Sequence, residues 1–264
     1  MNKILFFILF LLLLIVGKER GVKTFFTFLI CMIQIIIYIF LMRLGFNSII
    51  LAFITCVIAS LVSIFFLNGY SVKTVSAFIG VIIVQLIVFI LIYIISRSAS
   101  IGAFGEESLE TIAFFNFDIK YNMNDVIIGV FLVSVVGTVI DTSISIASAM
   151  NEVYENNSHI NDKDLYKSGM NVGGDILSTT INTLYFAVIS SFIGFFMWHR
   201  NMPIENMINY KIFTKDLVQL FIVFIGSILI IPVTAYISSK LLACKKYNLL
   251  KKKMNLLNNK KSIH

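Results

Sequence analysis

Charged residues, cysteine and histidine are all scarce in this sequence. Asp, Glu, Lys and Arg make up 13% of the 264 residues, against about 25% in soluble domains. Together with a mean hydropathy of +0.93, this scarcity excludes a soluble globular protein. The three cysteines form no C-x-x-C pair, and the three histidines follow no metal-binding spacing. We therefore expect no disulfide framework, no metal and no cofactor.

Long apolar runs are abundant instead, and about 20 apolar residues suffice to cross a bilayer. The first run is short, like the apolar region of a signal peptide, but no small-residue cleavage site follows it. The sequence therefore predicts an all-α, polytopic transmembrane helical bundle of about seven spans, or six if the first is cleaved. The runs are Ile4–Val16, Phe25–Met42, Ser48–Leu67, Thr74–Ser96, Val126–Met150, Ile176–Trp198 and Leu217–Ser238.

Positive charge collects on one side of these spans. With seven spans, one side carries seven Lys and Arg residues and the other carries fourteen. Because cytoplasmic loops are enriched in Lys and Arg, we expect the N-terminus outside and the C-terminus in the cytoplasm. No aromatic platform or recognition motif accompanies the lysines, so no nucleic-acid partner is expected.

The C-terminal tail holds much of this charge, with eight lysines and no acidic residue after Ser239. Leucine and methionine recur among these lysines at helical spacing. Residues 240–264 therefore form either a basic amphipathic helix on anionic inner-leaflet lipids or a disordered tail that only fixes topology. Residues 1–239 are predicted to form the membrane domain.

Asp141 lies inside a run, Val126–Met150, that is otherwise free of charge. An ionisable side chain in a bilayer costs about 2.5 to 3.5 kcal/mol on insertion scales, so it usually has a partner or lines a pathway. Ser145 follows one helical turn later on the same face. Gly129 and Gly137 on this helix are predicted to allow close packing of another helix. Asp141 is thus either a contact between helices or a site residue.

A second carboxylate, Asp175, precedes the next apolar run. The residues between the two runs, 151–174, are predicted to form a loop with one short helix, Leu165–Met170, which Asn171 and the Gly173–Gly174 pair would end. Asp175 would then stand at the start of the next helix, either as its N-cap or as a site residue. Gly173 and Gly174 are also candidates for close helix packing.

Thr179 and Asn182 follow Asp175 at helical spacing, so this helix also carries a polar stripe. Asn182 is either a helix contact or a site residue. We hypothesise that Asp141 and the turns from Asp175 to Asn182 line one polar cavity in the cytoplasmic half of the membrane.

At these residues the chain resembles the YibE/F family of bacterial multi-spanning membrane proteins. That family carries a G-x-x-x-D segment that runs into a serine- and alanine-rich helix end, followed by Ser-Gly-Met-Asn, Gly-x-Asp and Thr-Asn-Thr stretches. The resemblance implies a bacterial inner-membrane location and a multi-pass fold, and it brings no established activity. Here the corresponding segments are Gly137–Asp141, Ser143–Ala149, Leu165–Asn171, Gly173–Asp175 and Thr180–Thr183.

Two departures from the family pattern bear on function. Family members often have a glycine where this chain has Ser178, so the close backbone approach that glycine permits is in doubt here. Longer members carry an extracytoplasmic domain near the N-terminus, for which this chain has no room. The chain therefore looks like the shorter of two related partners.

Three classes of function remain open. The first is a permease of a small solute or ion, in which Asp141 binds a cation or relays a proton. The second is a non-catalytic membrane subunit that pairs with a larger related protein or with its own copies. The third, the least favoured, is an enzyme like the intramembrane aspartyl proteases, whose Gly-x-Gly-Asp motif is only partly matched by Gly173–Asp175. We expect that the protein is not an enzyme.

Overall fold

The structure, a computed structural model, describes residues 2–98, 123–157 and 160–243. Within these ranges every element is a helix, and six helices are long and apolar enough to cross a membrane. The predicted all-α transmembrane bundle is therefore confirmed. The elements are α1 (Asn2–Arg43), α2 (Ser48–Leu61), the π-helix η1 (Val62–Phe66), α3 (Val72–Ser98), α5 (Met123–Asn156), α6 (Asp162–Trp198), α7 (Ile204–Ile208) and α8 (Lys211–Ala243).

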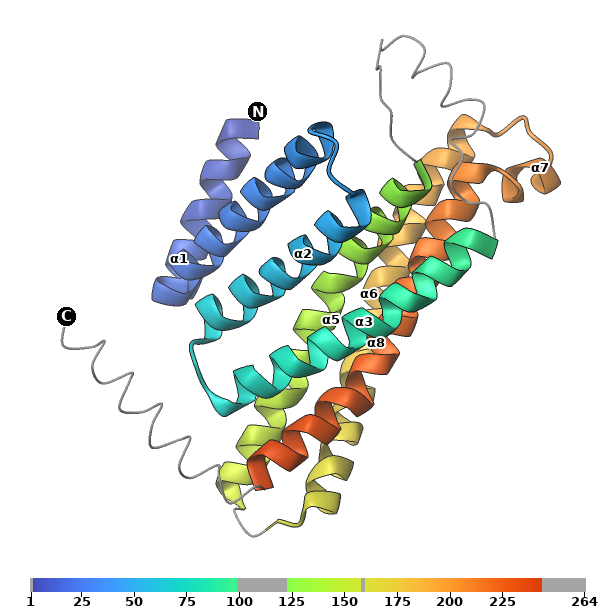
Figure 1. Cartoon of the computed structure of the whole chain (residues 1–264). Helices are drawn as coiled ribbons and strands as arrows, with labels where there is room; N and C mark the ends of the chain where they lie inside the picture. Colours follow the sequence, from blue (N-terminus) through green and yellow to red (C-terminus); the bar gives the residue numbers. More distant parts are fainter. Residues whose placement is uncertain (1, 99–122, 158–159, 244–264) are drawn as a thin grey trace.

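Helix α1 is a hairpin of two arms that turns at Lys18 (Figure 1). Lys18 has φ 46° and ψ −126°, outside the helical region. The ring of Phe25 lies 4.6 Å from that of Phe10 and 5.4 Å from that of Phe6. In a straight helix, residues 15 apart are separated by about 22 Å. Because α1 contains both N-terminal apolar runs, the six helices hold all seven predicted runs.

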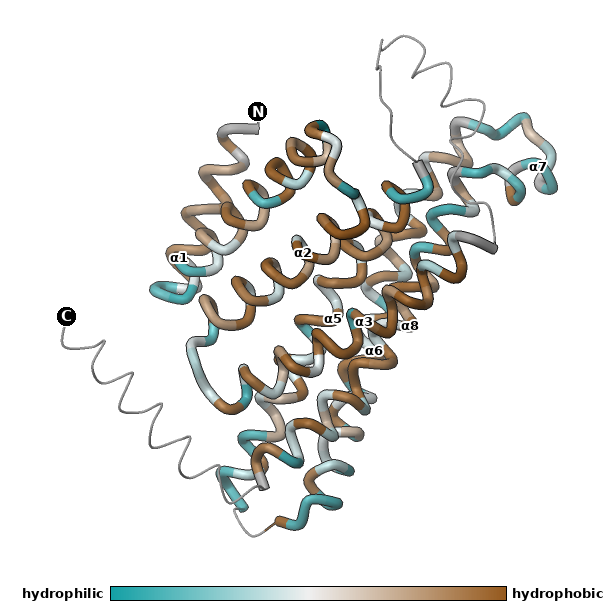
Figure 2. Tube along the Cα trace, in the orientation of Figure 1, coloured by the Kyte–Doolittle hydropathy of each residue, from teal (hydrophilic) through white to brown (hydrophobic). Residues whose placement is uncertain are grey.

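Helices α3, α5 and α8 form the centre of the bundle, and α2 and α6 flank α5 (Figure 1). Figure 2 shows apolar residues along the long helices and polar residues at the turns and around α7. The Ser143 hydroxyl of α5 donates to the Ala77 carbonyl of α3 at 3.0 Å. Its oxygen lies 3.0 Å from the Thr234 hydroxyl of α8. Since Ser143 has only one proton, Thr234 is the donor in this second bond.

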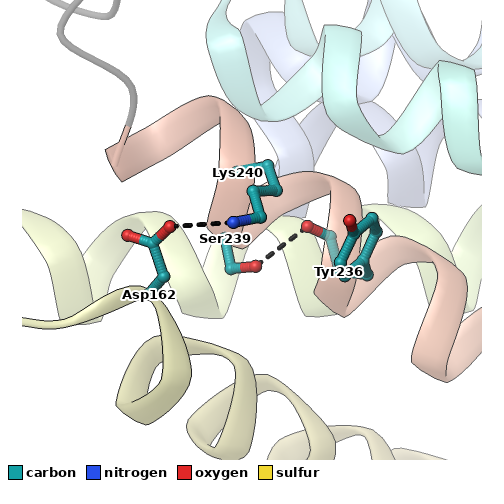
Figure 3. Close-up of polar contacts among 4 residues, drawn as sticks. All are labelled: Asp162, Tyr236, Ser239 and Lys240. Atoms are coloured by element: carbon teal, nitrogen blue, oxygen red, sulfur yellow. Dashed lines mark hydrogen bonds and ion pairs between the residues drawn. The ribbon is translucent and has the colours of Figure 1, made fainter.

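The lower ends of α6 and α8 are joined by an exposed ion pair, with Lys240 Nζ 3.2 Å from an Asp162 carboxylate oxygen (Figure 3). An exposed pair of this kind adds little stability. It shows that the C-terminal end of α8 lies beside the start of α6. The predicted basic tail lies outside the described residues from position 244 onward.

The predicted break before Asp175 is wrong. Helix α5 continues to Asn156, and α6 runs without interruption from Asp162 through Asp175 to Trp198. The connection between the two helices therefore covers only residues 157–161, and Asp175 lies inside α6, where it caps no helix. Neither Gly173 nor Gly174 has the positive φ that a glycine ending a helix usually adopts.

The predicted helix break failed because Gly173 serves helix packing and does not end a helix. A Cβ atom on Gly169 would lie 2.5 Å from the Met150 sulfur and 3.1 Å from the Ala235 Cβ. A Cβ on Gly173 would collide with the Ile231 side chain of α8. These two glycines let α6 approach α5 and α8 closely, as small residues commonly do between membrane helices.

Replacement of Gly21 by leucine should separate the two arms of α1, because the new side chain would collide with the backbone carbonyl of Leu13. We expect a lower Tm in detergent, equivalent to a loss of about 1 to 3 kcal/mol. Gly17→Leu is the matched control, since nothing lies within 4 Å of the Cβ that it would add. An equal loss in both variants would contradict the hairpin contact.

Alanine substitutions at Gly173 and Gly174 should have opposite effects on stability. In a continuous helix, Gly174→Ala should raise stability by up to about 1 kcal/mol, the difference in helix propensity, because no atom lies within 4 Å of its new Cβ. Gly173→Ala should lower the Tm, because its new Cβ would collide with Ile231. The Tm of both variants, measured on the monomer in detergent, checks this, and a destabilising Gly174→Ala would argue against an unbroken α6.

Candidate functional site

The segment around Asp141 is divided between the two sides of α5. Thr142 and Ser143 are buried, with exposed fractions of 1% and 0%. Asp141 and Ser145 are exposed on the opposite side of the helix. The Ser145 hydroxyl donates to the Asp141 carbonyl of its own helix at 2.7 Å. The motif thus supplies both a core contact and an outward polar stripe.

Asp141 lies deep along α5. It is about 22 Å from the end of the helix at Asn156 and about 27 Å from the start at Met123. Within the described ranges its carboxylate forms no ion pair and no hydrogen bond to another side chain. Gly137, one turn away on the same face, has no atom within 4 Å of the position where a Cβ would be. This side of α5 is therefore open and carries an uncompensated carboxylate.

The polar stripe of α6 also faces away from the bundle. Asp175, Thr179 and Asn182 are exposed, and none of the apolar window of α6 is buried. Gly173, on the packed side, precedes Asn182 by nine residues, about two and a half turns, so the two lie on opposite sides of the helix. The Thr179 hydroxyl donates to the Ile176 carbonyl of its own helix at 2.9 Å.

The two stripes lie at similar depth. Gly169 meets Met150 and Gly173 meets Ile146, which fixes the register of the antiparallel helices α5 and α6. In this register Asp141 is level with Ser178, about one turn from both Asp175 and Asn182.

No hydrogen bond or ion pair joins the two stripes in the part of the chain that the structure describes. Asp141 lies nine residues before Met150, and Ser178 lies nine residues after Gly169, so each is on the opposite side of its helix from the contact between Met150 and Gly169. Neither carboxylate forms an interaction with the other stripe in the described part of the chain. A shared cavity around Asp141 and Asp175 stays a prediction.

The glycines predicted for close packing fall into two pairs. A Cβ on Gly129 would lie 2.6 Å from the Tyr38 hydroxyl and 3.2 Å from the Ala52 Cβ, so α5 packs tightly against α1 and α2 there. Gly173 is equally enclosed. Gly137 and Gly174 have open space instead, and both lie beside a polar stripe.

A cavity of about 300 Å³ lies between α5, α6 and α8, and sequence reasoning missed it. Its polar lining consists of Asp216 and Gln219 of α8, Ser134 of α5 and Ser191 of α6. Sequence reasoning started the last span at Leu217 and so left Asp216 outside, whereas α8 begins at Lys211. The helical spacing of Asp216 and Gln219 could have indicated that both lie on the same face of one helix. The other lining residues are Leu184, Val188, Phe192, Leu220 and Val223.

Ser134 connects the cavity to the stripe of α5. It precedes Asp141 by seven residues, about two turns and 10 Å along the axis, so both lie on nearly the same face. Gly137 lies between them on that face. One face of α5 therefore runs from a carboxylate-lined cavity to a second carboxylate.

The chemistry of these groups is that of single carboxylates among neutral oxygen atoms. Asp216 has an amide and two hydroxyls around it, and Asp141 has the hydroxyl of Ser145 one turn away. In the described residues no three His, Cys, Asp or Glu side chains come together in a group that could hold a metal ion. The arrangement suits a proton or a partly hydrated cation, with one charge to balance at each carboxylate.

The family model described as YibE/F-like protein matches residues 5–244. No curated protein and no solved structure matches the chain. The matched range contains all six membrane-length helices together with both polar stripes. The chain therefore belongs to the YibE/F-like family of membrane proteins.

Proposed function

We propose that the protein is a permease that moves protons or a small cation across the membrane along the polar face of α5. The observation that carries this proposal is the continuity of that face. Asp216 lines a cavity that Ser134 also lines, and Ser134 shares its face with Asp141. Transport sites in membrane proteins are commonly built from ionisable residues near the bilayer interior.

Asp141 is the central residue of the proposed pathway. A carboxylate in the apolar part of a membrane requires a compensating charge, and no described residue supplies one to Asp141. A transported cation or proton balances that charge transiently. The open space at Gly137 and the small side chain of Ser145 leave room for a hydrated ion beside the carboxylate.

The proposed orientation places the Asp216 cavity toward the outside. The turn at Lys18, the connection from α2 to α3, and the lower ends of α5 and α8 lie toward one end of the bundle, at the lower left of Figure 1. Lys73 and Lys163 also lie near that end. Following the positive-inside rule, we assign this end to the cytoplasm of a bacterial inner membrane.

The proposal gives neither aspartate a catalytic role. An aspartyl protease needs two carboxylates close enough to share a proton. Asp141 and Asp175 are each exposed, and no hydrogen bond or ion pair joins them in the described residues.

A second candidate function is that of a non-catalytic subunit. The exposed polar face of α6 supports it, since none of the apolar window of that helix is buried in the single chain. A face of this kind is expected to contact another protein in the membrane.

Asp141→Asn should reduce cation flux by at least about tenfold, a change equivalent to 1.4 kcal/mol, because the variant keeps the shape of the side chain but removes its charge. The assay uses the full chain in liposomes under a membrane potential, with H⁺, Na⁺, K⁺ and Mg²⁺ offered in turn. Asp216→Asn should mainly weaken the apparent affinity for the transported ion, since Asp216 lines the entrance.

The matched control is Asp164→Asn, which also neutralises an aspartate but in the exposed first turn of α6. Its flux should equal that of the wild type. A flux unchanged in Asp141→Asn, or no flux of any of the four ions with the wild type, would overturn the permease.

A further inference from the structure

The outward side of α6 carries a regular series of residues that form no hydrogen bond or ion pair with another helix of the described chain. Successive members are spaced four, three, four, three and four residues apart, the heptad spacing of two helices that pack side by side. All are exposed except Ile189, which is half-buried. We call this series the α6 seam; it consists of Asn171, Asp175, Ser178, Asn182, Tyr185 and Ile189.

Asn182 shows that lipid is a poor neighbour for the seam. It lies about 9 Å inside the apolar stretch of α6 that begins at Ile176. Its side-chain amide forms no hydrogen bond to another described residue. Hydrocarbon offers no donor or acceptor, so an amide at this depth is satisfied by a polar group of another protein surface or by water.

We propose that the α6 seam is the contact between two copies of this chain, packed in parallel around a two-fold axis along the membrane normal. Copies inserted with the same orientation bring each seam residue opposite itself. An amide both donates and accepts, so Asn182 pairs with its own counterpart, and a serine hydroxyl does the same at Ser178. In coiled coils an asparagine buried in the heptad seam favours one register of a parallel helix pair, and Asn182 is the seam asparagine that lies within the apolar stretch.

The surroundings of the seam fit a close helix contact. Gly174 lies beside it with no atom within 4 Å of its Cβ position, and Ser178 is also small. Small residues let two membrane helices approach. Behind the seam, Gly169 and Gly173 hold α6 against α5 and α8, so the seam rests on a firmly packed helix.

Asp175 is the one seam residue that opposes the dimer. Two carboxylates would face each other there, about 10 Å from Asn182 toward the start of α6 and just outside the apolar stretch. Water at that level screens their repulsion. Neutralising Asp175 should therefore tighten the dimer. The dimer does not depend on the cation pathway, since Asp141 is not part of the seam.

Disulfide crosslinking in native membranes tests the contact. The test uses the full chain with Cys31→Ser and Cys244→Ser, while buried Cys56 is kept. Each variant then carries one added cysteine, whose crosslinking reports whether that position lies at the contact. Ser178→Cys and Tyr185→Cys should form a disulfide-linked species of twice the 29.9 kDa chain mass on mild oxidation. Thr183→Cys and Ala187→Cys, exposed on the same helix but outside the seam, should form at least about tenfold less.

Dimer affinity in liposomes gives a second readout, by single-molecule photobleaching at a series of protein densities. Asn182→Leu should raise the dimer Kd about 3- to 30-fold, as expected for loss of a hydrogen bond between membrane helices. Thr183→Leu should leave the Kd unchanged, and Asp175→Asn should lower it.

Three results would overturn the proposal. They are crosslinking as strong at positions 183 and 187 as in the seam, a single photobleaching step at every density, and crosslinked species whose masses all differ from twice that of the chain. The third would assign the seam to a different membrane protein. None of these results bears on ion flux, so the permease and the dimer are tested separately.

Discussion

The hydrogen-bonded contact among Ser143, the Ala77 carbonyl and Thr234 fixes the rotation of α5, and the outward polar stripe depends on it. Three helices meet at this buried point, where Gly80 leaves room for the Thr234 side chain. Asp141 precedes Ser143 by two residues, which places it about 160° away around the helix. The contact that joins the core therefore turns Asp141 out of it.

In helix α6, contacts at glycines rather than at hydroxyl groups fix the rotation of the helix. Gly169 and Gly173 allow α5 and α8 to approach, and no larger residue fits at either position without a shift. Ser178 and Asn182 follow these glycines by nine residues each, so the packed face and the polar face are opposite. In both helices the polar stripe is outward because the small residues that build the core occupy the other side.

The sequence was sufficient to predict the apolar spans and the family, because hydropathy, helical spacing and short motifs are local properties. The choice of Asp141 and Asn182 as site residues stays a prediction. The sequence was insufficient at Gly173 and Gly174, since a glycine pair looks the same whether it ends a helix or admits a neighbour. It also missed Asp216, because helix boundaries are set by tertiary contacts. Spacing shows which residues share a face, but the direction of that face depends on the neighbouring helices.

The two outward stripes require two different explanations. A dimer through the α6 seam gives the Asn182 amide a partner, but it supplies no positive charge and does not use Asp141. In the proposed permease, the charge of Asp141 is instead balanced by an ion that moves along α5 past Ser134 and the cavity that Asp216 lines. An amide needs only a hydrogen-bond partner, which a second copy provides permanently. A carboxylate in an apolar span needs a countercharge, and a permeating cation provides it without a fixed partner.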